Sequence, residues 1–280
     1  MIDDATIKAQ FASWFGRRIE QHDTIDQRLV EQFKATLFPY VADNLAVPAG
    51  IFWCLSPDIE TADKLGGDGH PKTGLFMPDL PFPRRMWAGG ELVFHDEFLL
   101  DQRVDKTTTI EDIVVKSGKS GQLSFVTVRH QYHGNGKLLL DERQDIVYRE
   151  PSPLTVVPKP DVEARPLLDV WTVDATSTLL FRYSALTFNG HRIHYDHPYA
   201  TGVEGYAGLV VHGPLQATLM LNLASQCLGR TPVRFSYRGQ SPLIAGQTFR
   251  VEAFARPEGG IDARVVSAQG ITTMTAHAEL

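Results

Sequence analysis

The richest group of residues for acid–base chemistry lies between Phe181 and Asp196. This stretch, FRYSALTFNGHRIHYD, contains Asn189, His191 and His194 and follows neither a helical nor a strand period. A histidine near its ordinary pKa exchanges protons at neutral pH, whereas an asparagine amide can orient a water molecule but cannot titrate. The residue types therefore indicate proton transfer on a substrate with help from a positioned water. The histidines have no recognisable metal-ligand spacing, so we expect no metal.

A second chemical feature begins at Gly213. Gly213 and Pro214 form a good helix start, and Gly229 is a natural stop. The positive end of this helix would stabilise negative charge that develops near Gly213. The residues from Leu215 to Cys227 leave almost no polar face, so the helix must be buried. A buried helix wrapped by an antiparallel sheet is the arrangement called a hotdog.

The elements around these residues are mainly strands. Their side chains are rich in Val, Ile, Leu and aromatics, and glycine turns separate them. We expect strands at Ile113–Lys116, Leu123–Tyr132, Lys137–Tyr148, Leu179–Leu186, Val233–Tyr237, Thr248–Phe254, Ala263–Ala268 and Thr272–His277. Residues 5–37 have helical spacing, with Asp23 or Thr24 as a cap. Residues 56–90 predict a long Gly/Pro-rich loop, which is usually functional or a lid.

The chain also predicts an internal duplication. Leu99–Val104 and Leu243–Val251 are similar and lead into strands about half a chain apart. Residues 151–166 contain five prolines and predict a stiff linker. We therefore expect an α+β double hotdog, each half a long helix wrapped by an antiparallel sheet. Residues 1–150 would form the N-terminal half and residues 167–280 the C-terminal half.

Composition sets broader limits. The 280 residues carry a formal net charge of −6, which argues against a general nucleic-acid binder. No apolar run approaches the length of a membrane span, and the acidic start lacks the features of a signal peptide. With only Cys54 and Cys227, a disulfide framework is not expected. These features predict a soluble cytoplasmic protein with no nucleic-acid or membrane partner.

The catalytic stretch resembles the hydratase motif of MaoC-like enoyl-CoA hydratases. It is more similar to type 2 hydroxyacyl-thioester dehydratases and to mesaconyl-C4-CoA and itaconyl-CoA hydratases. The likeness rests on Tyr183–Leu186, Ile193-His194, Val211–Gly213 and LPFPRRMWAGGE at 80–91. It implies reversible hydration of a 2-enoyl-CoA, with the CoA thioester as substrate and no cofactor.

The resemblance also assigns roles to three residues. His194 falls on the catalytic histidine, and Gly213 on the glycine whose backbone N–H holds the thioester oxygen. Asn189 falls where MaoC-like enzymes carry a catalytic aspartate, so His194 would do most of the proton work unless Asp196 assists. His191, His197 and His212 are expected to be structural or exposed, and Asn189 could instead shape a turn.

Further candidates concern substrate binding. A carboxylated acyl chain needs a cation, for which Arg84 or Arg85 is a candidate, with Trp87 in the apolar wall and Arg192 as a competitor. The alternative is that Arg84 and Arg85 form an exposed basic doublet. A last pair, Arg234 and Arg238, lies on one face of a strand and could bind the phosphates of coenzyme A or simply be solvated.

Two other functions stay open at this point. A hotdog thioesterase would use a carboxylate to activate water, and Asn189 argues against it. A non-catalytic acyl-CoA sensor is the other alternative. The N-terminal half has no second Asn–His–Gly set, so we expect one active site per chain, with residues 76–90 supplying the acyl pocket. The chain could pair into a homo-oligomer or already be the functional pseudo-dimer.

Overall fold

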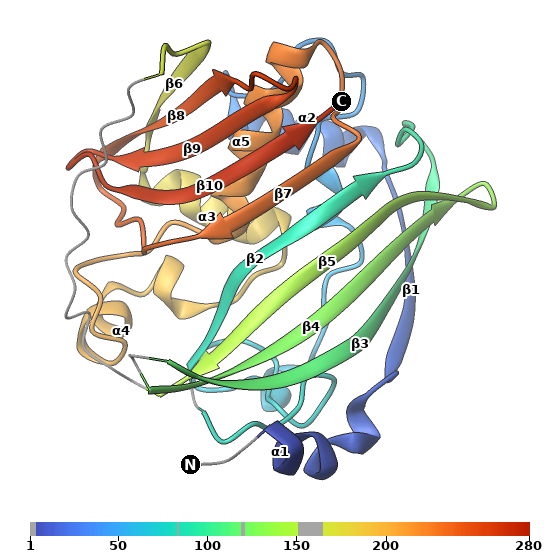
Figure 1. The fold of residues 1–280 in the computed structure, drawn as a ribbon, viewed down its shortest axis with the longest axis vertical. Coiled ribbons are helices and arrows are strands. Elements are labelled where there is room, and N and C mark those ends of the chain that lie inside the picture. The colour runs from blue at the N-terminus through green and yellow to red at the C-terminus, as the bar shows by residue number, and fades with distance from the viewer. Residues whose placement is uncertain (1–3, 83, 119–120, 151–164) are drawn as a thin grey trace.

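The computed structural model describes residues 4–82, 84–118, 121–150 and 165–280 (Figure 1). Its described strands form one ten-stranded antiparallel sheet. They are β1 (Arg18–Thr24), β2 (Arg84–Phe94), β3 (Arg103–Gly118), β4 (Gly121–Gly134), β5 (Lys137–Arg149), β6 (Asp169–Asp174), β7 (Arg234–Gly239), β8 (Thr248–Ala255), β9 (Ile261–Ser267) and β10 (Thr272–Glu279). All of the expected strands are confirmed except Leu179–Leu186.

The strand order repeats on the two sides of the sheet. It runs β1-β3-β4-β5-β2 and then, mirrored, β7-β10-β9-β8-β6. The halves join where β2 pairs with β7, from Gly89 opposite Arg238 to Val93 opposite Arg234. The two similar segments that suggested a duplication run into the first residues of β3 and β8, which hold equivalent places in this order. The double hotdog is thus confirmed.

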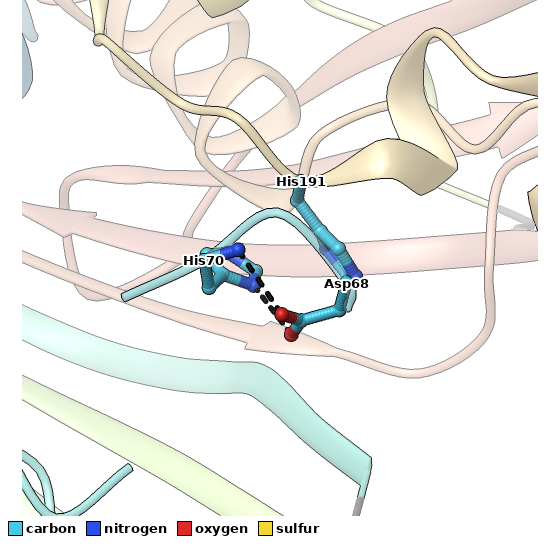
Figure 2. Close-up of side chains that lie close together, drawn as sticks. All are labelled: Asp68, His70 and His191. Atoms are coloured by element: carbon cyan, nitrogen blue, oxygen red, sulfur yellow. Dashed lines mark hydrogen bonds and ion pairs between the residues drawn. The ribbon is translucent and has the colours of Figure 1, made fainter. Parts of the chain in front are cut away.

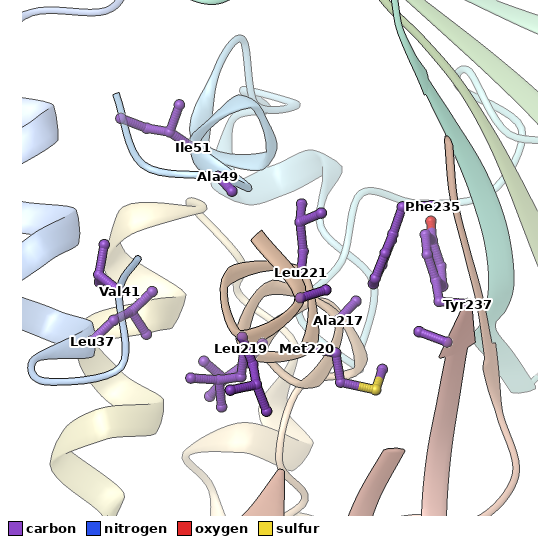
Figure 3. Packing of buried hydrophobic residues seen from close by; sticks show 14 of the residues in the cluster. Leu37, Val41, Ala49, Ile51, Ala217, Leu219, Met220, Leu221, Phe235 and Tyr237 are labelled. Atoms are coloured by element: carbon purple, nitrogen blue, oxygen red, sulfur yellow. The ribbon is translucent and has the colours of Figure 1, made fainter. Parts of the chain in front are cut away.

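Helix α5 (Gly213–Leu228) is the buried helix of the C-terminal half. It packs against β8, β9 and β10 (Figure 1) and ends at Gly229, whose φ of 72° suits glycine. Its other sides meet Leu37, Val41 and residues near Ile51 (Figure 3). Asn222, one of the buried polar residues of this helix, donates to the Ala49 carbonyl at 2.8 Å and so fixes the N-terminal loop onto the helix.

The N-terminal half differs from the expected long helix. Its described helices are α1 (Asp4–Gln10), α2 (Gln27–Leu37) and 3₁₀ turns at Ile51–Cys54, Ala62–Lys64 and Ala12–Trp14. Among the described residues, none of these is as long as α5, and α2 packs on α3 (Ser177–Leu186). No helix as long as α5 therefore covers β3, β4 and β5 among the described residues, and side chains of these strands form part of a cavity wall.

The expectation of a helix throughout residues 5–37 is wrong in its middle. Arg18–Thr24 is the edge strand β1, whose side chains alternate between exposed and half-buried. That two-residue alternation is the mark of a strand with one covered face. The cap of α2 is neither Asp23 nor Thr24 but Asp26, whose side chain accepts from Leu29 N at 2.7 Å.

Two further expectations also change. Leu179–Leu186 lies in helix α3, because Thr176 caps it and Leu180, Tyr183 and Ser184 bury one helical face. The loop predicted for residues 56–90 ends earlier, since β2 begins at Arg84. Nearly all of the predicted linker, 151–164, lies outside the described residues. Helix α4 (His197–Gly202) and a 3₁₀ turn at Arg192–His194 complete the fold.

No described helix is long and apolar enough to span a membrane. The two cysteines are free thiols, as expected.

Candidate active site

A cavity of about 1530 Å³ lies where the two halves meet. Its wall combines β2 and the loop before it with the Arg192–His194 turn, the first turn of α5 and the start of β10. The cavity extends beneath β3, β4 and β5, where it meets Thr108, His130 and Gln144. Both halves thus contribute to one site, and both supply acid–base residues: Asp68, His70 and His130 come from the N-terminal half, and His191 and His194 from the C-terminal half.

His194 is held on this wall as a neutral base. Its side chain is 7% exposed, and Nδ1 lies 2.7 Å from the Val210 carbonyl oxygen. Because a carbonyl oxygen only accepts, Nδ1 carries the hydrogen and Nε2 keeps a lone pair. Burial, opposed by the Val210 bond, lowers the pKa of His194 to about 4. At neutral pH His194 is therefore ready to accept a proton.

The ring of His212 packs against the ring of His194. The two imidazoles stack with centroids 3.6 Å apart, and Ser184 Oγ lies 2.8 Å from His212 Nε2. His212 is fully buried, and burial together with the His194 charge lowers its pKa well below the ordinary value. A second charge beside His194 is thus disfavoured. His212 occupies the structural position expected for it.

Asn189 and Gly213 both line the cavity. Asn189 Oδ1 accepts from His191 N at 2.9 Å, so the side chain does shape its own turn. Gly213 opens α5, and a Cβ there would sit 2.8 Å from the Trp87 ring. Trp87 in turn stacks on Tyr237 at 4.5 Å, which makes Trp87 a fixed apolar wall. The water-orienting and oxyanion roles of Asn189 and Gly213 stay predictions.

The cavity also holds a cluster that sequence reasoning missed. Asp68 and His70, from the loop before β2, meet His191 of the catalytic stretch (Figure 2). One ligand atom of each lies within 4.8 Å of the others, so the trio could in principle hold a metal ion. The only sequence signal was an Asp-Gly-His run in a glycine-rich loop judged to be functional. His191, expected to be structural or exposed, is instead a cavity residue.

The candidate arginines differ in whether another protein group already binds them. Arg84 is committed to Glu204, with Nε 3.2 Å from the carboxylate and Nη2 donating to its carbonyl. Arg192 is bound to Asp196 at 2.7 Å and lies over the Tyr199 ring. This pairing also occupies Asp196, the residue suggested to assist His194.

Arg85 and the β7 arginines complete this comparison. Arg85 lines the cavity and forms no ion pair among the described residues, although its charge acts on His70 and His191. Arg234 pairs with Glu91 at 2.9 Å and is exposed, as is Arg238, and neither lines the cavity. Arg85 is thus the arginine best placed to meet a substrate.

Comparison with known proteins identifies the family of the chain. Residues 51–245 match the family described as hydroxyacyl-thioester dehydratase type 2. The chain is 42% identical to the mesaconyl-C(4)-CoA hydratase of Chloroflexus aurantiacus, over 97% of this chain and 98% of that protein. It is 27% identical to the mitochondrial hydroxyacyl-thioester dehydratase type 2 of Schizosaccharomyces pombe, over 82% and 87% of the two chains.

Solved structures agree on the fold. A MaoC-like dehydratase superposes with a TM-score of 0.69 at 12% identity, covering 96% of this chain and 99% of that one. A Mycobacterium tuberculosis protein described as a double hotdog gives a TM-score of 0.56 at 15% identity, covering 94% and 95%. At these identities the likeness shows the fold alone. On its sequence matches, the chain belongs to the type 2 hydroxyacyl-thioester dehydratase family, whose MaoC-like double hotdog it shares.

Proposed function

We propose that the protein catalyses the reversible hydration of a 2-enoyl-CoA, with mesaconyl-C4-CoA as its substrate. The single observation that carries the reaction type is a neutral, buried His194 at the cavity wall beside the first turn of α5. The reaction adds only water, so no redox or group-transfer cofactor is needed. Cytoplasmic location and homo-oligomer formation stay predictions.

The chemistry follows from these groups. His194 Nε2 takes a proton from water as the water oxygen bonds to Cβ of the enoyl group. The displaced electron pair moves to the thioester oxygen, and the backbone N–H at Gly213 stabilises that enolate with the help of the helix dipole. A proton added at Cα completes the hydration. Asn189 can hold the attacking water through its amide but cannot take the proton.

Arg85 supports the choice of a carboxylated acyl group. In mesaconyl-C4-CoA the free carboxylate is bonded to the carbon that water attacks, so its cation must lie near the base. Arg85 lines the same cavity and acts electrostatically on His191, the neighbour of His194. A guanidinium binds a carboxylate through two parallel hydrogen bonds. Arg84 and Arg192 are already engaged by Glu204 and Asp196.

The test compares two substrates and two variants. Loss of enoyl absorbance is followed with mesaconyl-C4-CoA and with crotonyl-CoA, which lacks the carboxylate. Arg85→Ala should lower kcat/KM for mesaconyl-C4-CoA by about 10²-fold or more and hardly change crotonyl-CoA turnover. Arg103→Ala, on an exposed side chain of β3, is the matched control and should behave as wild type. A wild-type enzyme that prefers crotonyl-CoA would rule out the carboxylate site.

A further inference from the structure

The cavity wall carries more positive charge than the proposed reaction uses. Its lining cations are Lys72, Arg84, Arg85, Lys106, Arg149 and Arg192. Arg84 and Arg192 are paired with carboxylates, and the two lysines donate to backbone carbonyl oxygens. Arg85 is the proposed partner of the acyl carboxylate. Arg149 is therefore the lining cation that still has no role.

The guanidinium of Arg149 has no partner in the part of the chain that the structure describes. It forms no ion pair and no side-chain hydrogen bond there, and its Nε is buried without an acceptor. A buried donor that lacks an acceptor is costly and uncommon in folded proteins. A bound anion would supply the acceptor and neutralise the charge at the same time.

The neighbouring strand adds to the positive charge at this place. Arg149, at the end of β5, lies directly opposite Arg84, at the start of β2, so both side chains leave the sheet on the same face. Like charges in such a pair destabilise the sheet. The carboxylate of Glu204 lies 3.2 Å from Arg84 Nε and neutralises that one charge. The charge of Arg149 is left for a ligand.

This pair lies at an edge of the cavity, away from the catalytic base. Val203, next to the glutamate that binds the pair, lines the cavity but is 65% exposed, so the wall reaches solvent here. The charge of Arg149 acts on the pKa of Tyr206, whereas the charge of Arg85 acts on that of His191 beside the base. Arg85 is thus the inner cation and Arg149 the outer one.

A second edge of the cavity is less suited to an anion. Asp58 and Glu60 line the wall there, and Asp58 is exposed. Two carboxylates repel a negatively charged group that approaches between them. An anionic part of the substrate is therefore expected at the edge that carries Arg149.

We infer that Arg149 binds a phosphate group of coenzyme A while the acyl group lies at His194. Coenzyme A carries its thioester at one end of a neutral pantetheine arm and its phosphates at the other end, which matches a base inside the cavity and a cation at its edge. A guanidinium binds a phosphate through two parallel N–H···O bonds. This inference rests on the proposed function. It gives the phosphates a site other than Arg234 and Arg238, which do not line the cavity.

The test compares mesaconyl-C4-CoA with the same acyl group on pantetheine, which has no phosphate. In wild type, kcat/KM should be about 10-fold or more higher for the CoA thioester, the scale of a hydrogen bond between charged groups. Arg149→Ala should lower kcat/KM for the CoA thioester by about that factor and leave the pantetheine thioester unaffected. Arg143→Ala, an exposed position on the same strand that does not line the cavity, is the matched control and should equal wild type with both thioesters.

A third thioester identifies the phosphate that is bound. Dephospho-CoA lacks the 3′-phosphate but keeps the diphosphate. If Arg149→Ala and wild type turn over mesaconyl-C4-dephospho-CoA equally well, Arg149 binds the 3′-phosphate. If the variant is as impaired as it is with the CoA thioester, Arg149 binds the diphosphate. Either result supports the inference.

Three results would overturn it. Equal kcat/KM of wild type for the CoA and pantetheine thioesters would mean that no phosphate contributes, and this measurement does not depend on the folding of a variant. Unchanged turnover of the CoA thioester by a folded Arg149→Ala would remove Arg149 from the site, and equal losses with both thioesters would give it a structural role only. In all three cases hydration persists and the proposed function stands. A wild-type enzyme that hydrates neither thioester would instead refute the proposed function, and this inference with it.

Discussion

Replacing His194 by Gln should weaken the acid sensitivity of the fold. The folded protein holds the pKa of His194 at about 4, whereas the ordinary value is 6.5. As the pH falls below 6.5, the unfolded chain binds a proton at this position and the folded chain does not. Unfolding is therefore favoured as the pH falls toward about 4. Between pH 7 and pH 5 this linkage amounts to about 2 kcal/mol.

The assay is urea unfolding at pH 7 and pH 5 for three proteins. Wild type should lose about 2 kcal/mol more stability between these pH values than His194→Gln, which has no titratable ring there. Other buried histidines, such as His130, titrate in both proteins and cancel in the comparison. His197→Gln, at an exposed position, should lose as much as wild type. Equal losses in wild type and His194→Gln would mean that His194 is not held neutral, and the assignment of the base would fail.

Three more predictions concern the site. Asn189→Ala should reduce turnover while Asn189→Asp is partly tolerated, and equal kcat in wild type and Asn189→Ala would reduce the residue to a turn former. Gly69→Ala must push its loop off Gly190 O and should lower kcat/KM by about 10²-fold, so an unchanged kcat/KM would show that the loop is not part of the site. Calorimetric titration with a tight enolate-mimicking inhibitor should give one site per chain, and two equivalent sites would contradict the division of labour between the halves.

The sequence was most informative where burial is complete. Helix α5 is buried from Leu215 to Ser225 and mainly apolar, and β8 to β10 are bounded by turn residues, so their patterns depend on local sequence alone. The edge strand β1 was predicted as helix because its exposed charged face, together with nearby aromatic residues, resembles the pattern of an amphipathic helix. Helix α3 was predicted as a strand because its apolar and aromatic residues fit either element, and the helix cap at Thr176 was not recognised.

The site was predictable where its residues are close in sequence. His194, Asn189 and His191 fall within six residues, and Gly213 follows at a recognisable helix start. Asp68 meets His191 only because a loop from the other half folds onto it, and no local pattern encodes that contact. The choice between neighbouring arginines likewise depends on Glu204, a distant partner that engages one of them.

The most direct test of hydration is the mass of the CoA ester after incubation of mesaconyl-C4-CoA with the enzyme, measured beside free thiol. We expect an ester heavier by one water molecule, no released thiol, and a rate at least about 10²-fold lower with His194→Gln. Release of free thiol as fast as the enoyl absorbance falls would identify a thioesterase. A His194→Gln variant with more than half of the wild-type rate would contradict the central role of that residue.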